Sequence, residues 1–404
     1  MRIALTTIGC KLNQSEIQDL KTDLQKAGYI LIEKNQPHDL HIFNACSITQ
    51  GAEKITNQKI RKVKRNNPQS QIIVMGCLNK PIPEITKVFK NKEQALKYIL
   101  KNFPAEAVMV SPSASSGQAL KVYSEQSRTK PSAVAKTRAL IKIQDGCNFN
   151  CSYCIITKFR GQAKSIPVNK IIEQIQAKEK QGYKEIVLVG VNILLYQSAQ
   201  TNLAGLVKKI LQETKIPRIR FSSLDPRLIS ADFLALLKNP LLCPHLHLSL
   251  QSGCDKILNL MNRHYTAGQY LKIVKQSRRI NPLTSITTDI ILGFPGETEK
   301  NFQVTLNFIK KIDFLKIHLF PYSPRPGTQA AKFKNQVPEK VKKQRFVKLN
   351  KLAQIQKEKF IKKMKGKIMP VLFEGNNYGF TPNYIQIKKR SLKNLKNKII
   401  QVKI

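Results

Sequence analysis

The chain has 404 residues, a length that suggests two or three domains, each large enough to bury its own core. Lysine and arginine total 69 against 25 acidic residues, a net charge of +44, while hydrophobic residues make up 42% of the chain. This composition excludes a disordered basic tail and favours a polyanionic partner such as a nucleic acid. Lysine-rich coding bias is an alternative explanation for part of the charge, because 54 of the basic residues are lysines.

The longest mainly apolar run, residues 186–196, is about half the roughly 20 residues that a membrane-spanning helix requires. The first residues lack the apolar core and the small-residue cleavage site of a signal peptide. We therefore expect a cytoplasmic protein that has no membrane partner. In that reducing compartment the eight cysteines predict metal or redox chemistry rather than disulfides.

The first hundred residues alternate between β-like runs and helical patterns. Strands are predicted at residues 2–7, 29–32, 40–44 and 71–75, and helices at residues 13–27 and 50–67, the second strongly basic. This alternation predicts a small α/β domain with a mainly parallel sheet over residues 1–104. Cys10, Cys46 and Cys77 each follow the carboxyl end of a predicted strand, the edge at which open α/β sheets bind ligands.

Residues 105–138 are rich in Ser, Ala, Lys and Pro, which predicts a linker. Six further strands are predicted at residues 139–143, 185–189, 218–222, 245–249, 285–292 and 314–319. Helical patterns separate them, so residues 139–339 are predicted to form an incomplete (βα)6 barrel. Its chemistry is expected at the carboxyl ends of the strands.

The C-terminal part of the chain is the most basic. A helix is predicted at residues 340–365, and short alternating runs at residues 366–404 predict a small β-barrel. Residues 340–404 hold 19 basic residues and two acids. Three aromatic residues interleave there with three basic ones: Tyr378, Phe380, Tyr384, Lys388, Lys389 and Arg390. This composition suits stacking on unpaired bases, and packing of the small barrel is the competing explanation.

The strongest motif is GCNFNCSYC, in which Cys147, Cys151 and Cys154 have a C-x3-C-x2-C spacing directly after the first predicted barrel strand. Three thiolates on a cubane iron–sulfur cluster leave one iron open to substrate, whereas an electron-transfer cluster usually takes four cysteines. A structural zinc site is less favoured, because it needs a fourth ligand and no histidine lies between His41 and His245.

With Tyr153 before its last cysteine, this motif resembles that of the radical S-adenosylmethionine (SAM) superfamily. The resemblance implies that the open iron binds SAM, which one electron cleaves to methionine and a 5′-deoxyadenosyl radical. Gly190 and Asn192 follow the second barrel strand, where members of the superfamily contact SAM, and Asp289 lies on the fifth. The resemblance thus makes these three residues SAM-binding candidates.

GCKLNQSE, FNACSIT and MGCL, around Cys10, Cys46 and Cys77, resemble the three-cysteine motifs of the methylthiotransferases. That family resemblance implies a second 4Fe-4S cluster on these cysteines, where sulfur is assembled and methylated. It also implies a C-terminal RNA-binding β-barrel of the TRAM type. GCKLNQSE, LCPHLHLSLQSG and FPYSPRPGT favour the threonylcarbamoyladenosine tRNA subgroup (MtaB), although Asp225 and His264 depart from the family pattern.

The function implied is transfer of a methylthio group to carbon 2 of threonylcarbamoyladenosine at position 37 of tRNA, beside the anticodon. Its cofactors are two 4Fe-4S clusters and SAM, and its partners are the tRNA anticodon loop, an electron donor and a sulfur source. Isopentenyladenosine tRNA or an aspartate of a ribosomal protein is the alternative substrate. A non-catalytic, metal-containing RNA-binding protein is the alternative from another class.

Some side chains are less informative. Cys243 and Cys254 lie outside both cysteine sets, and we expect buried thiols without a ligand role. We expect at most one of His245 and His247 to face the barrel interior.

Overall fold

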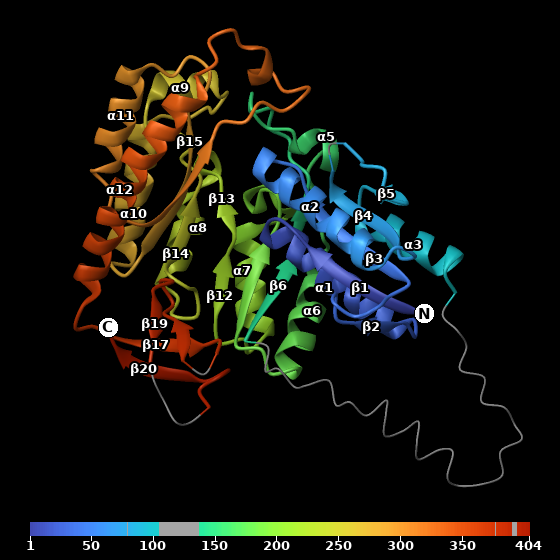
Figure 1. Cartoon of the computed structure of the whole chain (residues 1–404). Helices are drawn as coiled ribbons and strands as arrows, with labels where there is room; N and C mark the ends of the chain where they lie inside the picture. Colours follow the sequence, from blue (N-terminus) through green and yellow to red (C-terminus); the bar gives the residue numbers. More distant parts are fainter. Residues whose placement is uncertain (79, 105–136, 376, 390–393) are drawn as a thin grey trace, which may run out of the picture.

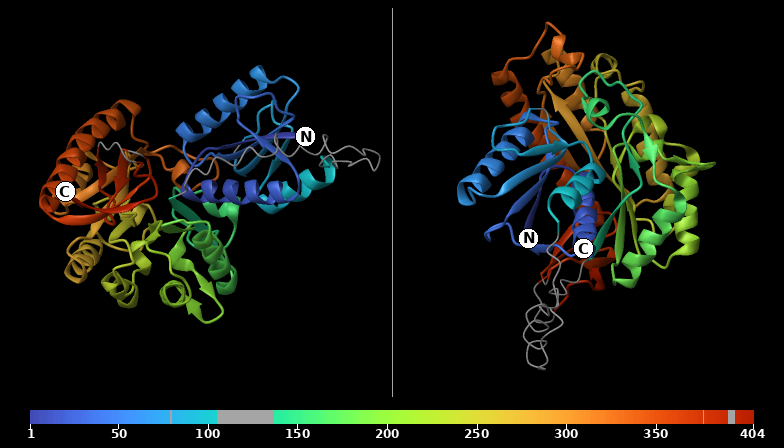
Figure 2. Two further views of the ribbon diagram at one scale, coloured as in Figure 1. Left: turned by 90° about the horizontal axis from the view of Figure 1, so that it is seen from below. Right: turned by 90° about the vertical axis from the view of Figure 1, so that its right-hand side faces the viewer.

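The computed structural model describes residues 1–78, 80–104, 137–375, 377–389 and 394–404 (Figure 1). The N-terminal sheet, drawn in blue, and the C-terminal sheet, drawn in red, lie on the same side of the barrel strands (Figure 2). The predicted linker falls almost entirely outside the described residues, so its boundaries stay a prediction. No helix in the described part of the chain is long and apolar enough to cross a membrane.

The N-terminal sheet has the order β2-β1-β3-β4-β5, and all its strand pairs are parallel. Its elements are β1 (Arg2–Thr7), α1 (Lys11–Lys26), β2 (Ile30–Ile32), β3 (Leu40–Cys46), α2 (Gln50–Asn66), β4 (Gln71–Cys77), β5 (Lys87–Phe89) and α3 (Lys92–Asn102). β3 is buried throughout because it lies at the centre of the sheet with helices on both faces. Leu20 and Leu24 of α1 pack on one face, and Ile60 of α2 packs on the other.

Six parallel strand positions follow in chain order. Their strands are β6 (Arg138–Lys142), β9 (Glu185–Val189), β12 (Ile219–Phe221), β13 (Ser223–Leu224), β14 (His245–Leu248), β15 (Ser285–Leu292) and β16 (Phe314–Pro321). β12 and β13 are the two halves of one strand, separated by Ser222. β6 and β16 are the outer strands of the two sheets, so the barrel is open between them. The predicted α/β fold with an incomplete (βα)6 barrel is confirmed.

Helices alternate with these strands and cover the outside of the barrel (Figure 1). They are α6 (Val168–Lys180), α7 (Leu203–Glu213), α8 (Ala231–Ala235), α10 (Ala267–Ile280) and α11 (Glu299–Ile309). Two further helices are α9 (Asp255–Leu260), which follows β14, and α5 (Ile156–Arg160), which contacts β4 of the N-terminal sheet. Short 3-10 helices are η1 (Ile193–Leu195), η2 (Pro226–Leu228), η3 (Leu236–Lys238) and η4 (Ala330–Lys332). Two short antiparallel pairs, β7 (Gln144–Asp145) with β8 (Lys164–Ser165) and β10 (Gln197–Ser198) with β11 (Thr201–Asn202), lie in the loops.

The basic helix α12 (Glu339–Met364) packs along the barrel and leads into the C-terminal sheet. This antiparallel sheet has the order β19-β18-β17-β20 and consists of β17 (Ile368–Phe373), β18 (Tyr378–Phe380), β19 (Gln386–Lys388) and β20 (Ile399–Lys403).

Buried charges join the C-terminal sheet to the barrel. Glu185 of β9 is fully buried and pairs with Arg138 (2.6 Å) and Arg220 (2.7 Å). Arg138 also reaches Glu374 (2.7 Å), which follows β17, and Arg220 donates to the Pro382 carbonyl (3.0 Å). Because a buried charge needs partners, these contacts fix where the C-terminal sheet meets the barrel.

The N-terminal sheet contacts the barrel through α1. Leu12 packs against Val187 and Val189 of β9, and Glu16 pairs with Lys142 of β6 at 2.9 Å. Helix α1 therefore covers the barrel edge formed by β6 and places the residues at its N-terminus beside the barrel opening.

Candidate active site

The first cysteine set gathers at the carboxyl edge of the N-terminal sheet. Cys46 and Cys77 end β3 and β4 and are paired in their parallel register. Cys10 directly precedes α1, in the turn that follows β1, the neighbour of β3. This turn requires Gly9, because its φ is +128° and an added Cβ would lie 2.7 Å from the Cβ of Cys46. The sheet thus brings together three cysteines that are far apart in the sequence.

The chemistry of this set fits a metal cluster. Burial raises the pKa of Cys46 to about 11, and the nearby thiols of Cys10 and Cys77 act in the same direction. Burial likewise raises the pKa of Cys77, against the opposing effect of the Arg160 guanidinium. Clustered thiolates in such a place need a bound cationic centre to compensate their charge, and an iron–sulfur cluster supplies one.

The second set, Cys147, Cys151 and Cys154, lies on the loop between β7 and α5. Ser152 anchors this loop, because its N–H and hydroxyl donate to consecutive carbonyls at the end of α9, at 3.1 and 2.7 Å. Burial raises the pKa of Cys154 to about 12, and the other two thiols of the set contribute to the rise. The donor set is again three free thiols that lie near enough to raise one another's pKa. Three thiol ligands fit a cluster with one open iron.

Two arginines that no sequence motif had indicated approach the second set. Arg227 and Arg263 place guanidinium nitrogens 3.8 and 3.7 Å from the Cys151 sulfur. Asp225 orients both, at 2.6 Å from Arg227 and 3.0 Å from Arg263. Their positive charge stabilises thiolates and an anionic cluster. The only signal in the sequence was the unusual Asp225 in a motif of the family.

Of the three SAM candidates, Gly190 and Asn192 lie together after β9, whereas Asp289 lies on β15. Gly190 must be glycine, because an added Cβ would lie 2.8 Å from the Gln144 carbonyl oxygen. The Asn192 side-chain oxygen is buried and has no hydrogen-bond partner among the described residues. Such an orphaned acceptor fits a ligand that donates hydrogen bonds, as an amino group does. No contact joins Asp289 to Gly190 or Asn192 in the described part of the chain.

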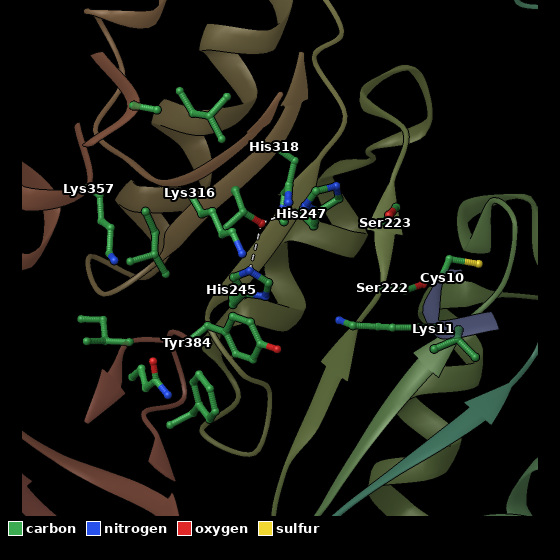
Figure 3. A pocket seen from close by; sticks show the side chains of 18 of the residues that line it. Cys10, Lys11, Ser222, Ser223, His245, His247, Lys316, His318, Lys357 and Tyr384 are labelled. Carbon is green, nitrogen blue, oxygen red and sulfur yellow. Dashed lines mark hydrogen bonds between the residues drawn. The ribbon is translucent and has the colours of Figure 1, made fainter. Parts of the chain in front are cut away.

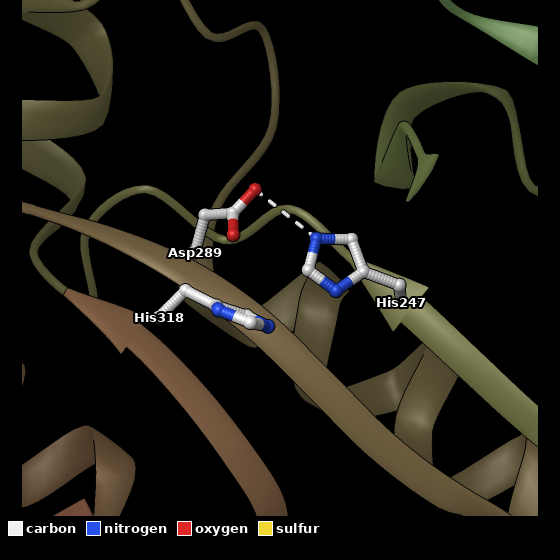
Figure 4. A group of neighbouring side chains, drawn as sticks. All are labelled: His247, Asp289 and His318. Carbon is white, nitrogen blue, oxygen red and sulfur yellow. Dashed lines mark hydrogen bonds and ion pairs between the residues drawn. The ribbon is translucent and has the colours of Figure 1, made fainter. Parts of the chain in front are cut away.

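Asp289 instead belongs to a polar group on the barrel wall with His247 and His318 (Figure 4). One potential ligand atom from each of these residues lies within 4.8 Å of the others. His247 Nε2 lies 3.1 Å from the Asp289 carboxylate. Burial opposes ionisation of this carboxyl, but the His247 ring beside it holds the pKa of Asp289 below its usual range.

The expectation that at most one of His245 and His247 faces the barrel interior is wrong. Residues two apart on a strand share a face, and both rings hydrogen-bond with the Thr287 hydroxyl, at 3.1 and 2.9 Å. Cys243 and Cys254 are buried, as expected.

A cavity of about 670 Å³ lies between the barrel strands, α1, α12 and the C-terminal sheet (Figure 3). Three lysines, Lys11, Lys316 and Lys357, and three histidines, His245, His247 and His318, are among its lining residues. Burial lowers the pKa of His245 and of His318, so the positive charge of the cavity comes from the lysines. No acidic residue is among the described residues that line it. Cys10 and Gly190 also line it, so this cationic cavity adjoins the first cysteine set and a SAM candidate.

The aromatic residues near the C-terminal sheet do not form a surface on which bases could stack, because two of the three rings are covered by other side chains. Phe380 and Tyr384 stack on each other, with ring centroids 5.0 Å apart. The guanidinium carbon of Arg220 lies 4.5 Å from the Tyr384 ring, and that of Arg138 lies 5.5 Å from the Phe380 ring. Tyr378 is 41% exposed. Packing against the barrel therefore accounts for two of the three rings.

Comparisons with known proteins agree with the geometry. Residues 141–309 match the radical SAM superfamily, and residues 2–98 match the uncharacterized protein family UPF0004. The chain is 32% identical to the threonylcarbamoyladenosine tRNA methylthiotransferase MtaB of Aquifex aeolicus over the whole of both chains. It is 37% identical to the enzyme of that name from Chlamydia pneumoniae, covering 92% of this chain and 86% of the relative.

A third relative carries another name. The tRNA-2-methylthio-N(6)-dimethylallyladenosine synthase of Thermodesulfovibrio yellowstonii is 34% identical, covering 96% of this chain and 91% of the relative. Among solved structures, the radical SAM methyltransferase TsrM of Kitasatospora setae matches with a TM-score of 0.57 at 12% identity, covering 82% of this chain and 77% of that one. At that identity the match shows the fold alone.

These matches favour an enzyme over a non-catalytic RNA-binding protein. Radical SAM enzymes use SAM with a 4Fe-4S cluster, and methylthiotransferases carry two such clusters. The chain therefore belongs to the radical SAM methylthiotransferase family.

Proposed function

We propose that this enzyme transfers a methylthio group to carbon 2 of threonylcarbamoyladenosine at position 37 of tRNA, giving the 2-methylthio derivative. The observation that carries the proposal is the cationic cavity lined by both Cys10 and Gly190. One space thus adjoins the residue sets proposed for the sulfur-bearing cluster and for SAM. The names of the relatives from Aquifex aeolicus and Chlamydia pneumoniae support the same substrate.

Each cysteine set has one proposed role. The second set, Cys147, Cys151 and Cys154, holds the cluster that binds SAM. The first set, Cys10, Cys46 and Cys77, holds the auxiliary cluster. Bound SAM and its cluster supply a radical able to attack the unactivated C–H bond at carbon 2 of adenine. The proposed SAM contacts are Gly190, Asn192 and Asp289. Gly190 has no side chain and lets SAM approach the backbone closely, Asn192 offers as an acceptor a side-chain oxygen that is unpaired within the described part of the chain, and Asp289 offers a carboxylate.

The barrel strands, α1, α12 and the C-terminal sheet together shape the cavity, which is open to solvent where exposed side chains such as Lys316 and Lys357 line it. Helix α1 covers the edge of β6, while the C-terminal sheet closes the end of the cavity near Tyr384. An anticodon loop is single-stranded, so turning its base into such a cavity costs less than extruding a base from a duplex.

The basic residues of α12 and of the C-terminal sheet are proposed to bind the tRNA backbone. Their charge is concentrated, with 19 basic residues against two acids in residues 340–404. An electron donor and a source of sulfur are further partners that this chemistry requires.

Mass spectrometry of tRNA nucleosides from a strain lacking this gene tests the substrate. We expect the 2-methylthio-threonylcarbamoyladenosine peak to disappear while threonylcarbamoyladenosine accumulates. Complementation with the intact gene restores the peak, and complementation with a Cys77→Ala gene does not. An unchanged peak in the deletion strain would exclude the proposed substrate.

Dimethylallyladenosine tRNA is the second candidate substrate, because the relative from Thermodesulfovibrio yellowstonii carries that name at 34% identity. The same nucleoside analysis separates the two. Loss of the 2-methylthio-dimethylallyladenosine peak in the deletion strain would favour the second candidate.

A further inference from the structure

Lys11 is a charged side chain that reaches into the cavity, and no acidic residue is among the described residues that line the cavity with it. It begins α1, directly after Cys10, and extends toward Tyr384 (Figure 3). Its ammonium nitrogen lies 5.8 Å from the centre of the Tyr384 ring. Among the described residues it makes no hydrogen bond or ion pair. A half-buried ammonium in that position is an open site for an anion.

The charges around Lys11 leave its donors free. Glu185 is the acid that acts on it, but this carboxylate is fully buried and already paired with Arg138 and Arg220. Those two arginines add positive charge near Lys11. Lys316 lines the cavity as well, also without a hydrogen bond or ion pair within the described ranges. The local potential thus favours a negatively charged ligand.

Tyr384 has an unusual backbone at this place. Its φ is +69°, in the left-handed region that a bulky residue rarely adopts. The ring stacks on Phe380 and lies under the Arg220 guanidinium, so packing holds this conformation. The result is a rigid aromatic wall beside the Lys11 ammonium, which restricts where that ammonium can lie.

We propose that Lys11 binds the carboxylate of the threonylcarbamoyl group and so selects this nucleoside over adenosines that carry a neutral substituent at N6. The inference rests on the proposed function. Threonylcarbamoyladenosine has one carboxylate on its N6 substituent, whereas a dimethylallyl substituent is apolar. A neutral group at this place would leave the ammonium desolvated without an acceptor, which disfavours the wrong substrate.

Binding of three anticodon stem-loops to the cluster-loaded protein tests the proposal. The loops differ only at position 37, which is adenosine, threonylcarbamoyladenosine or dimethylallyladenosine, and fluorescence anisotropy under anaerobic conditions reports affinity. Intact protein is expected to bind the threonylcarbamoyl loop about tenfold or more tightly than the other two, the value of a charge-assisted hydrogen bond. Lys11→Met removes this preference, and Lys11→Arg retains most of it.

Lys208→Met is the matched control, because Lys208 is exposed on α7 and its loss changes the net charge equally. It is expected to keep the full preference. Iron content and the visible spectrum of Lys11→Met show whether the neighbouring cluster is intact.

The possible outcomes distinguish a failure of the role proposed for Lys11 from a failure of the proposed substrate. A Lys11→Met protein that still prefers the threonylcarbamoyl loop would overturn the role of Lys11 and leave the proposed function standing. Equal weakening of all three loops would show that Lys11 contacts a phosphate, which also overturns it. Intact protein without any preference for the threonylcarbamoyl loop would count against the proposed substrate itself.

Discussion

Arg160 and Glu16, 144 residues apart, form a two-pronged ion pair with nitrogen–oxygen distances of 2.8 and 3.1 Å. Arg160 ends α5, directly after the second cysteine set, and Glu16 lies in α1, which begins after Cys10. Both side chains are almost fully buried. The pair thus ties the segment that carries one cysteine set to the segment that carries the other.

Replacing Arg160 with Met is expected to lower the free energy of unfolding by about 3 kcal/mol, because it leaves Glu16 short of a buried partner. Denaturant titration measures the change. Arg61→Met is the control, since Arg61 pairs with Glu84 at the surface and such pairs contribute about 0–1 kcal/mol. Equal effects of the two substitutions would contradict a special role for the buried pair.

The same pair predicts a dependence on acid. Burial opposes ionisation of Glu16, but the hydrogen bond and charge of Arg160 outweigh it and lower the pKa of Glu16 from 4.5 to about 2. A lowered carboxyl pKa stabilises the folded protein above pH 4.5, and this contribution is lost as the pH falls toward 2. The melting temperature of cluster-free protein should therefore fall less steeply over this range in Glu16→Gln. Parallel curves for the two proteins would contradict the assignment.

Much of this arrangement could be predicted from local patterns. Barrel strands follow from apolar runs such as residues 186–189, and Cys147, Cys151 and Cys154 follow from a motif eight residues long. The Arg160–Glu16 pair could not be predicted, since it depends on how two separate sheets pack. The same holds for Arg227 and Arg263, which reach Cys151 only in the folded barrel.

Other differences have simple physical reasons. His245 and His247 share a face because side chains on a strand alternate with a period of two residues. Phe380 and Tyr384 look like a base-stacking surface in the sequence. Arg138 and Arg220, more than a hundred residues earlier, occupy their faces in the fold.

If each cysteine set holds one 4Fe-4S cluster, the loss of one set should halve the iron content of the protein. Two 4Fe-4S clusters require about eight iron atoms per chain. Cys77→Ala and Cys151→Ala should each retain about half of this amount. Only Cys77→Ala should still cleave SAM. Cys243→Ala is the control and should keep all its iron, because Cys243 is buried outside both sets. Full iron in Cys77→Ala would contradict the first set as a cluster site.

Arg227 is expected to raise the reduction potential of the cluster on the second set. Its guanidinium nitrogen lies 3.8 Å from the Cys151 sulfur, and positive charge stabilises the more negative, reduced state. Arg227→Met should lower the potential by tens of millivolts in a titration followed by electron paramagnetic resonance. Arg227→Lys keeps the charge and should restore most of the difference. An unchanged potential in Arg227→Met would show that the arginine has no electrostatic effect on the cluster.

Lys388 and Lys389, at the end of β19, belong to the basic residues proposed to bind the tRNA backbone, whereas Arg390 lies outside the described residues. Changing both lysines to Ala should weaken tRNA binding and reduce the slope of affinity against salt by about two, one unit for each lost phosphate contact. SAM cleavage should be unaffected. Lys272→Ala with Lys275→Ala, on the barrel helix α10, is a control of equal charge. The prediction fails if the control pair changes the slope equally.

The proposed function depends on which nucleoside receives the methylthio group. Purified, reconstituted enzyme is incubated with SAM, a reductant, sulfide and an equal mixture of two tRNAs, one with threonylcarbamoyladenosine and one with dimethylallyladenosine at position 37. Mass spectrometry of the nucleosides then identifies the product. We expect 2-methylthio-threonylcarbamoyladenosine as the dominant product, and a dominant 2-methylthio-dimethylallyladenosine peak would exclude the proposed substrate.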